Sequence, residues 1–290
     1  MTARLTGTSL PPWTMAIAAM LSIQLANALS VGVLREVGPA GTAWLRLCFG
    51  VVFLWIISRP ALRSIRRRDL PSLLILGMVT GFMTVFFLGA VERIPLGTAV
   101  AIEFLGPLIV AGLMSGNRRA LIWPAMALAG IVLLTEPWSG SFDPIGVGLA
   151  LAAGACWASY NVLTQRVGDR FAGISGLSLT IPIAALATMP VGLPQVINGN
   201  LAWWVLPAAA GIALITPVIA FGLEMLALKR MNHTAFGVLI GLLVLGQAPS
   251  VFQAVGVVIV VTAGAAAQWD GARKTSGNLT EVPAPEQSTQ

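Results

Sequence analysis

The sequence predicts an all-α membrane protein: a ten-helix bundle of two inverted five-helix repeats. Of its 290 residues, 57% are hydrophobic and 10% are charged, against roughly 25% charged in an average soluble domain. The apolar residues fall into ten runs, and most are close to the about 20 residues that a helix needs to cross a bilayer. Motifs of the first half of the chain recur in the second half.

The ten runs are joined by short connections that leave no room for a folded soluble domain between them. The runs cover residues 14–34, 41–58, 70–91, 94–116, 120–135, 145–165, 173–197, 201–228, 233–247 and 250–268. The first run follows Arg4 as a signal peptide would, but its full spanning length and the further runs favour a retained span. Residues 270–290 are polar, and we expect a disordered cytoplasmic tail.

Basic residues indicate the orientation, because cytoplasmic loops carry an excess of Lys and Arg. With a cytoplasmic N-terminus, outside loops hold only Arg35 and Arg93, and Arg46 lies within a span. The inside segments hold Arg4, Arg59, Arg63, Arg66, Arg67, Arg68, Arg118, Arg119, Arg166, Arg170, Lys229, Arg230, Arg273 and Lys274. Both termini are therefore predicted to be cytoplasmic. Since the basic residues sit in clusters between apolar runs and not along one face, no nucleic-acid partner is expected.

The sequence also argues against catalysis and metal binding. Cys48 and Cys156 lie inside apolar runs, and His233 has no Cys or His nearby, so neither a disulfide framework nor a metal site is expected. Nothing resembles a phosphate loop or a dinucleotide fingerprint, and no nucleophile–base pair is visible. We predict that the chain is not an enzyme and uses no cofactor.

The internal repeat divides the chain into residues 1–137, residues 138–269 and the tail. Val37-Gly38 is echoed by Val167-Gly168, and the end of the third span at Arg93 by the end of the eighth at Arg230. Because five spans is an odd number, the second repeat must insert upside down relative to the first. Inverted repeats are typical of secondary transporters, whose site lies at the repeat interface near the membrane midplane.

The repeat also reveals a short ninth span. Arg93 and Gly130 are 37 positions apart, whereas the matching Arg230 and Gly256 are 26 apart. About ten residues are missing, and Thr234 to Gly246 would span roughly 20 Å as a helix, less than the ~30 Å hydrocarbon core. Three explanations of the short ninth span stay open: local thinning of the bilayer, a re-entrant path of the chain, and a truncated variant of the protein.

Ionisable residues inside spans are costly and therefore candidates for function. Glu103 lies in the middle of the fourth span. Pro107 follows four residues later and has no N–H, so the backbone carbonyl of Glu103 lacks its usual helical hydrogen-bond donor. This arrangement suits proton coupling or substrate binding; the alternative is a packing role. Arg46 would pair with Glu103, bind a substrate carboxylate or snorkel to the interface. Glu224 is a further candidate, although an ion pair with Lys229 at the helix end is favoured.

Polar and aromatic residues of the first and sixth spans occupy matching parts of the two repeats. They would line an aqueous cavity: Gln24, Asn27, Trp157, Tyr160 and Asn161. The pairs Gly77/Gly81 and Gly237/Gly241 predict close contacts between helices and not a ligand site.

Three motifs resemble those of EamA-type drug/metabolite transporters, most closely the threonine/homoserine exporter branch. The run from Glu92-Arg-Ile-Pro-Leu-Gly through Glu103-Phe-Leu-Gly-Pro107 resembles the fourth-span motif. Gly154-Ala-Cys-Trp157-Ala-Ser-Tyr160 resembles the sixth-span motif, and Leu223-Glu224-Met-Leu-Ala-Leu resembles the end of the eighth span. The resemblance, from about residue 13 to residue 268, implies ten spans in two inverted halves. It also implies export of small metabolites, often amino acids, across the bacterial inner membrane, usually in exchange for protons.

The chain departs from the family after Phe236-Gly237-Val-Leu-Ile240, where a Glu-Pro element is usual and Gly241 follows directly. The predicted function is a secondary transporter of neutral amino acids such as threonine or homoserine, working by proton antiport. Its partners would be the amino acid, protons and the lipid bilayer, and a homodimer stays open. The alternatives are export of another metabolite or drug, and a transport-incompetent membrane protein with a defective ninth span.

Overall fold

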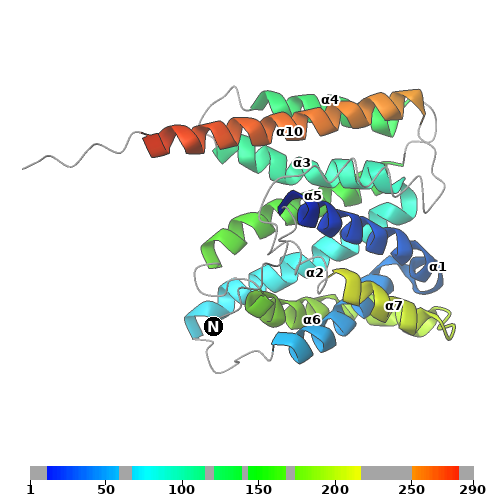
Figure 1. Cartoon of the computed structure of the whole chain (residues 1–290). Coiled ribbons are helices and arrows are strands. Elements are labelled where there is room, and N and C mark those ends of the chain that lie inside the picture. The colour runs from blue at the N-terminus through cyan, green and yellow to red at the C-terminus, as the bar shows by residue number, and fades with distance from the viewer. Residues whose placement is uncertain are drawn as a thin grey trace, which may run out of the picture.

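The computed structural model describes residues 12–58, 67–114, 121–138, 143–167, 174–216 and 250–280, which form a bundle of helices (Figure 1). The helices are α1 (Pro12–Ser58), η2 (Arg67–Asp69), α2 (Leu70–Arg93), α3 (Leu96–Met114), α4 (Ile122–Thr135), α5 (Pro144–Val167), α6 (Ile174–Asn198), α7 (Val205–Ala213) and α10 (Val251–Thr280). Each predicted run contains helix except 233–247, which lies outside the described residues.

The described helices are strongly apolar, and several have the length of membrane spans. Four are long and apolar enough to cross a membrane: Leu21–Ser58, Leu70–Arg93, Pro144–Thr164 and Gly176–Asn198. Shorter apolar helices cover Leu96–Val110, Ile122–Thr135, Val205–Thr216 and Val251–Ala267. Large apolar side chains such as Ile56, Leu113 and Leu186 are exposed, as expected where the surrounding solvent is lipid. The predicted class of all-α membrane protein is confirmed.

Helix α1 holds the first two predicted runs and bends sharply between them. Gly38 has φ 71° and ψ 170°, and Pro39 follows it. A positive φ favours glycine, and a Cβ atom at position 38 would lie 2.5 Å from Oε1 of Gln195 in α6. The same oxygen accepts a hydrogen bond of 2.9 Å from the backbone N–H of Gly41. The α6 side chain thus caps the helical arm that restarts after the bend.

Polar contacts tie the helix ends together on the side of the bundle that carries Gly38 (the Gly38 end). Asn200 Nδ2 donates to Glu36 Oε2 at 2.8 Å, and Arg93 forms an ion pair of 3.3 Å with Asp143. Asp143 also accepts hydrogen bonds from the first backbone N–H groups of α5, as an N-cap residue does. The N–H of Gly146 is the main cause that holds the pKa of the Asp143 carboxyl below its usual range, with Arg93 adding to it.

Glycines allow several helices to pack backbone against backbone. Gly77 and Gly81 of α2 lie against α6, where a Cβ atom would come within 2.6 Å of Ile183 and 2.9 Å of Ala184. The prediction that this pair marks a helix contact is confirmed. Gly130 of α4 and Gly256 of α10 meet reciprocally: a Cβ atom on either would lie 2.8 Å or 2.5 Å from the carbonyl oxygen of the other. Figure 1 shows α4 and α10 side by side at one edge of the bundle.

The last helix is longer than the last apolar run. Helix α10 continues to Thr280, beyond residue 269, where we placed the end of the second repeat. Residues 281–290 of the predicted tail lie outside the described residues.

Candidate functional site

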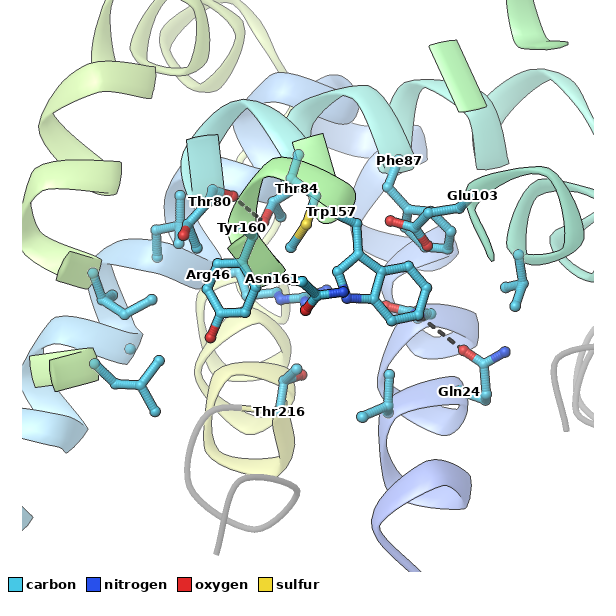
Figure 2. Close-up of a pocket in the computed structure, with 18 residues that line it drawn as sticks. Gln24, Arg46, Thr80, Thr84, Phe87, Glu103, Trp157, Tyr160, Asn161 and Thr216 are labelled. Atoms are coloured by element: carbon cyan, nitrogen blue, oxygen red, sulfur yellow. Dashed lines mark hydrogen bonds between the residues drawn. The ribbon is translucent and has the colours of Figure 1, made fainter. Parts of the chain in front are cut away.

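A cavity of about 270 Å³ lies among α1, α2, α3, α5 and α6 (Figure 2). Most of its wall surface is apolar, although half of the lining residues carry polar side chains. Its lining residues are Ile23, Gln24, Asn27, Arg46, Leu47, Gly50, Thr80, Met83, Thr84, Phe87, Val100, Glu103, Trp157, Tyr160, Asn161, Leu177, Ile181 and Thr216. An apolar wall with a few polar groups is typical of small-molecule sites.

The structure brings most of the predicted site residues together in this one cavity. They are Gln24, Asn27, Arg46, Glu103, Trp157, Tyr160 and Asn161. Pro107 lies within α3, four residues after Glu103, and is not among the lining residues. Glu224 lies outside the described residues, so its predicted role stays a prediction.

Among the described lining residues, the two charged ones occupy matching positions along different helices. Arg46 is seven residues past Pro39, where the second arm of α1 restarts, and Glu103 is seven residues past Leu96, the first residue of α3. At ~1.5 Å per residue, each lies about 10 Å in from the Gly38 end. They interact electrostatically, but among the described residues they form no direct ion pair.

A chain of buried hydrogen bonds holds Arg46. Its Nη1 donates to Oδ1 of Asn27 at 3.2 Å, and Nδ2 of Asn27 donates to Oε1 of Gln24 at 3.1 Å. Only 5% of Asn27 and 3% of Gln24 is exposed. Because buried polar groups are costly unless they are hydrogen-bonded, this chain fixes the direction of the guanidinium.

Aromatic residues form another part of the wall. The ring of Trp157 lies 6.0 Å from the ring of Phe104, centre to centre, in a tilted arrangement. Figure 2 shows Trp157, Asn161 and Tyr160 of α5 in the middle of the site, with Phe87 and Glu103 to one side. The sixth-span residues therefore bring both an apolar surface and polar tips to the cavity.

Helices α3 and α5 cross with direct backbone contact beside the carboxyl. A Cβ atom at Gly154 would lie 2.7 Å from the carbonyl oxygen of Glu103, and one at Gly106 would lie 1.9 Å from the carbonyl oxygen of Gly154. The carbonyl that Pro107 leaves without its helical donor therefore faces α5. The backbone position of Glu103 is set by this contact.

The sequence analysis missed the contribution of α2. Thr80, Met83, Thr84 and Phe87 all line the cavity. Thr80 and Thr84 are one helical turn apart, and their hydroxyls donate to the carbonyls of Leu76 and Thr80. The signal was their spacing of four in an otherwise apolar span, but such threonines are common in spanning helices because they can bond to their own backbone.

In the part of the chain that the structure describes, no three His, Cys, Asp or Glu side chains come together to hold a metal ion. The described residues of the cavity offer one cation, one carboxyl and several amides and hydroxyls on a mostly apolar wall. Such a set of groups is suited to binding a small polar molecule.

Comparisons with known proteins agree with this description. No protein-family model matches the chain. The threonine/homoserine exporter RhtA of Escherichia coli K12 is 33% identical over 268 residues, which cover 87% of this chain and 90% of RhtA. The pseudopaline exporter CntI of Pseudomonas aeruginosa is 22% identical over 263 residues, or 86% of this chain and 93% of CntI. A crystal structure with 22% sequence identity matches at a TM-score of 0.58 over 91% of this chain and 99% of its own, which shows a common fold.

These relatives are named as exporters, which are transporters and not enzymes. The identity to RhtA over most of both chains shows the family and confirms the resemblance inferred from the fourth-span and sixth-span motifs. The apolar helices agree with that assignment. The chain belongs to the EamA-type drug/metabolite transporter family that includes RhtA, and it is a multi-pass bacterial membrane protein of a family of small-molecule exporters.

Proposed function

We propose that this protein exports small neutral amino acids, threonine and homoserine in particular, across the bacterial inner membrane in exchange for protons. The observation that carries the proposal is the pair of opposite charges in one cavity. Arg46 and Glu103 line the same cavity, and they do not bond directly to each other. An amino acid carries a carboxylate and an ammonium, the complement of these two groups. The name of RhtA supports the same substrates.

The polar groups of the cavity favour a small polar substrate over the alternative of a lipophilic drug. Its volume of about 270 Å³ is close to the lower end of the range of about 300–1,000 Å³ typical of small-molecule pockets. Hydroxyls and amides project into it from α2 and α5, which suits a molecule with a short polar side chain.

Proton antiport requires that the proton and the substrate compete for one group. A substrate carboxylate on Arg46 acting alone would make Glu103 hold a proton more firmly, so exchange requires that the ammonium of the same molecule lie at Glu103. A substrate ammonium on Glu103 would displace the proton, which favours exchange. The proposal therefore places the ammonium at Glu103, which is ionised with substrate present and protonated when the carrier returns empty.

The architecture proposed for this cycle is ten helices in two inverted repeats, with both termini cytoplasmic and a short ninth span. The landmarks Val37 and Val167 differ by 130 positions. The same offset relates Leu47 to Leu177, and both belong to one apolar cluster between α1 and α6. The reciprocal contact of Gly130 and Gly256, which are matching repeat landmarks, is also expected of elements related by a two-fold axis. A homodimer stays a prediction.

Efflux of labelled threonine and homoserine from vesicles, with and without a pH gradient, tests the proposal. We expect efflux that the gradient accelerates, and loss of that acceleration in Glu103→Gln. The neutral amide has nearly the same shape, so it removes proton exchange while disturbing packing little. Gradient-dependent efflux from a well-expressed Glu103→Gln variant would refute the role of this carboxyl. No efflux from protein confirmed in the membrane would favour the transport-incompetent alternative.

A further inference from the structure

We infer that Arg46, held by Asn27 and Gln24, anchors the carboxylate of the transported molecule, so that the cavity selects ligands with a free carboxylate. This inference rests on the proposed function of the cavity as the transport site. It assigns the two ends of the substrate to different helices: the carboxylate to α1 and the ammonium to α3.

The Arg46 side chain is directed toward the first arm of α1. A snorkelling arginine would reach toward the nearest helix ends. Arg46 instead donates to Asn27, which lies ten residues before Val37, where the first arm of α1 ends. At ~1.5 Å per residue, Asn27 lies about 15 Å in from the Gly38 end, whereas Arg46 lies about 10 Å in. The guanidinium therefore turns inward, away from the interface.

The hydrogen-bond chain leaves donors of Arg46 for an anion. A guanidinium has five N–H donors in a planar fork, and the contact with Asn27 accounts for one of them. The Asn27 amide is fixed, because rotating it would lose both its acceptor contact with Arg46 and its donor contact with Gln24. A carboxylate matches the remaining geometry and can bond to the fork at two points.

The charge of Arg46 also favours an anionic ligand. A charged group inside a membrane protein is costly unless a partner compensates it. Among the described residues, Glu103 interacts with Arg46 through space but does not bond to it. A substrate carboxylate on the guanidinium supplies a direct counter-charge, while the ammonium of the same molecule lies toward the ionised Glu103.

Three small probes separate the two ends of the substrate. L-threonine carries both charges. L-threoninol keeps the ammonium and both the methyl and hydroxyl groups but has an alcohol in place of the carboxylate. 3-Hydroxybutyrate keeps the carboxylate and lacks the ammonium. Each probe is titrated against the purified full-length protein in detergent, and its binding is measured by calorimetry. Each probe is also tested in vesicles as a competitor of labelled threonine.

We expect threoninol to bind about 10- to 100-fold more weakly than threonine, the range of one or two charge-assisted hydrogen bonds. We expect 3-hydroxybutyrate to bind measurably. In Arg46→Gln, threonine should weaken to the level of threoninol, and 3-hydroxybutyrate binding should be lost. Arg46→Lys keeps the positive charge but lacks the planar guanidinium, so its affinity for threonine and 3-hydroxybutyrate should be intermediate. This variant preserves the test if Arg46→Gln does not fold. Arg93→Gln removes an arginine that is not among the residues lining the cavity and serves as the control.

Asn27→Ala tests the positioning role of Asn27. It should weaken threonine and 3-hydroxybutyrate and leave threoninol unchanged, because only the carboxylate uses the oriented guanidinium. A purely structural defect would weaken all three probes together.

The outcomes distinguish this inference from the proposed function. If threoninol binds as tightly as threonine, the carboxylate anchor is wrong even if threonine is exported. If 3-hydroxybutyrate binds in an Arg46-dependent way but threonine is not exported, the anchor stands and the proposed function fails. If neither threonine nor 3-hydroxybutyrate binds, both are overturned.

Discussion

The crossing of α3 and α5 makes a sharp prediction about Gly154. In Gly154→Ala, the new Cβ atom would lie 2.7 Å from the carbonyl oxygen of Glu103 and 3.3 Å from its Cα atom. Ordinary contacts begin at 3.4 Å, so the two backbones must separate by about 0.7 Å at this point. Overpacking of this kind costs about 1–3 kcal/mol, which a folded bundle can survive.

The separation moves Glu103 relative to Trp157, which is one turn further along α5. Since a misplacement of about 1 Å can cost up to about a hundredfold in a positioned reaction, we expect threonine efflux to fall by about tenfold at equal protein content. The assay is initial efflux from vesicles, normalised to the amount of correctly folded protein from size-exclusion chromatography.

Gly148→Ala is the matched control, because it lies on the same helix and has no atom within 4 Å of its added Cβ. It should transport as the unmodified protein does. Equal efflux from the two alanine variants would refute the reasoning that contact with α5 sets the position of Glu103.

Three further predictions concern stability, measured by thermal unfolding in detergent. Gly38→Ala should lose about 1–3 kcal/mol, because φ 71° with ψ 170° is a conformation that essentially only glycine adopts and the new Cβ would lie 2.5 Å from Gln195; Gly211→Ala, in open space, should show no such loss. The folded-state pKa of Asp143 is lowered chiefly by the Gly146 N–H, so its ionised form stabilises the fold above its unfolded pKa, and this contribution is lost as pH falls through the folded pKa. Asp143→Asn should therefore lose less stability on acidification than the unmodified protein. Trp55→Phe removes the 2.9 Å hydrogen bond from Nε1 to the Ser178 carbonyl and should cost about 0.5–1.5 kcal/mol; an unchanged unfolding temperature would show that lipid-side water or detergent replaces it.

The positions of many helices could be predicted from the sequence, because a bilayer restricts the composition of the helices that cross it. A spanning helix must be apolar over nearly its whole length, so the run 70–91 predicted α2 (Leu70–Arg93) within two residues. The bend at Gly38 was less visible, because its glycine–proline pair resembles an ordinary loop. Its conformation depends on Gln195, a residue more than 150 positions away.

The lining residues that were predicted are those whose side chains have a high free-energy cost inside a membrane. Those that were missed have a low cost. Glu103 and Arg46 stand out because charge in lipid needs a reason. Thr80 and Thr84 do not, since a hydroxyl can bond to its own helix. The link between Arg46 and Asn27 spans 19 positions and two arms of a bent helix. No local pattern encodes that contact, which depends on the angle at Gly38.

The exchange of a proton for the substrate ammonium at Glu103 is the central claim, and it can be measured without a membrane. Threonine is added to the purified protein in weakly buffered detergent solution, and the change in pH is followed from acid to alkaline starting values. The account predicts that threonine releases protons over part of this range and that Glu103→Gln releases none while still binding threonine. Proton uptake on adding threonine, or release that persists in Glu103→Gln, would contradict it.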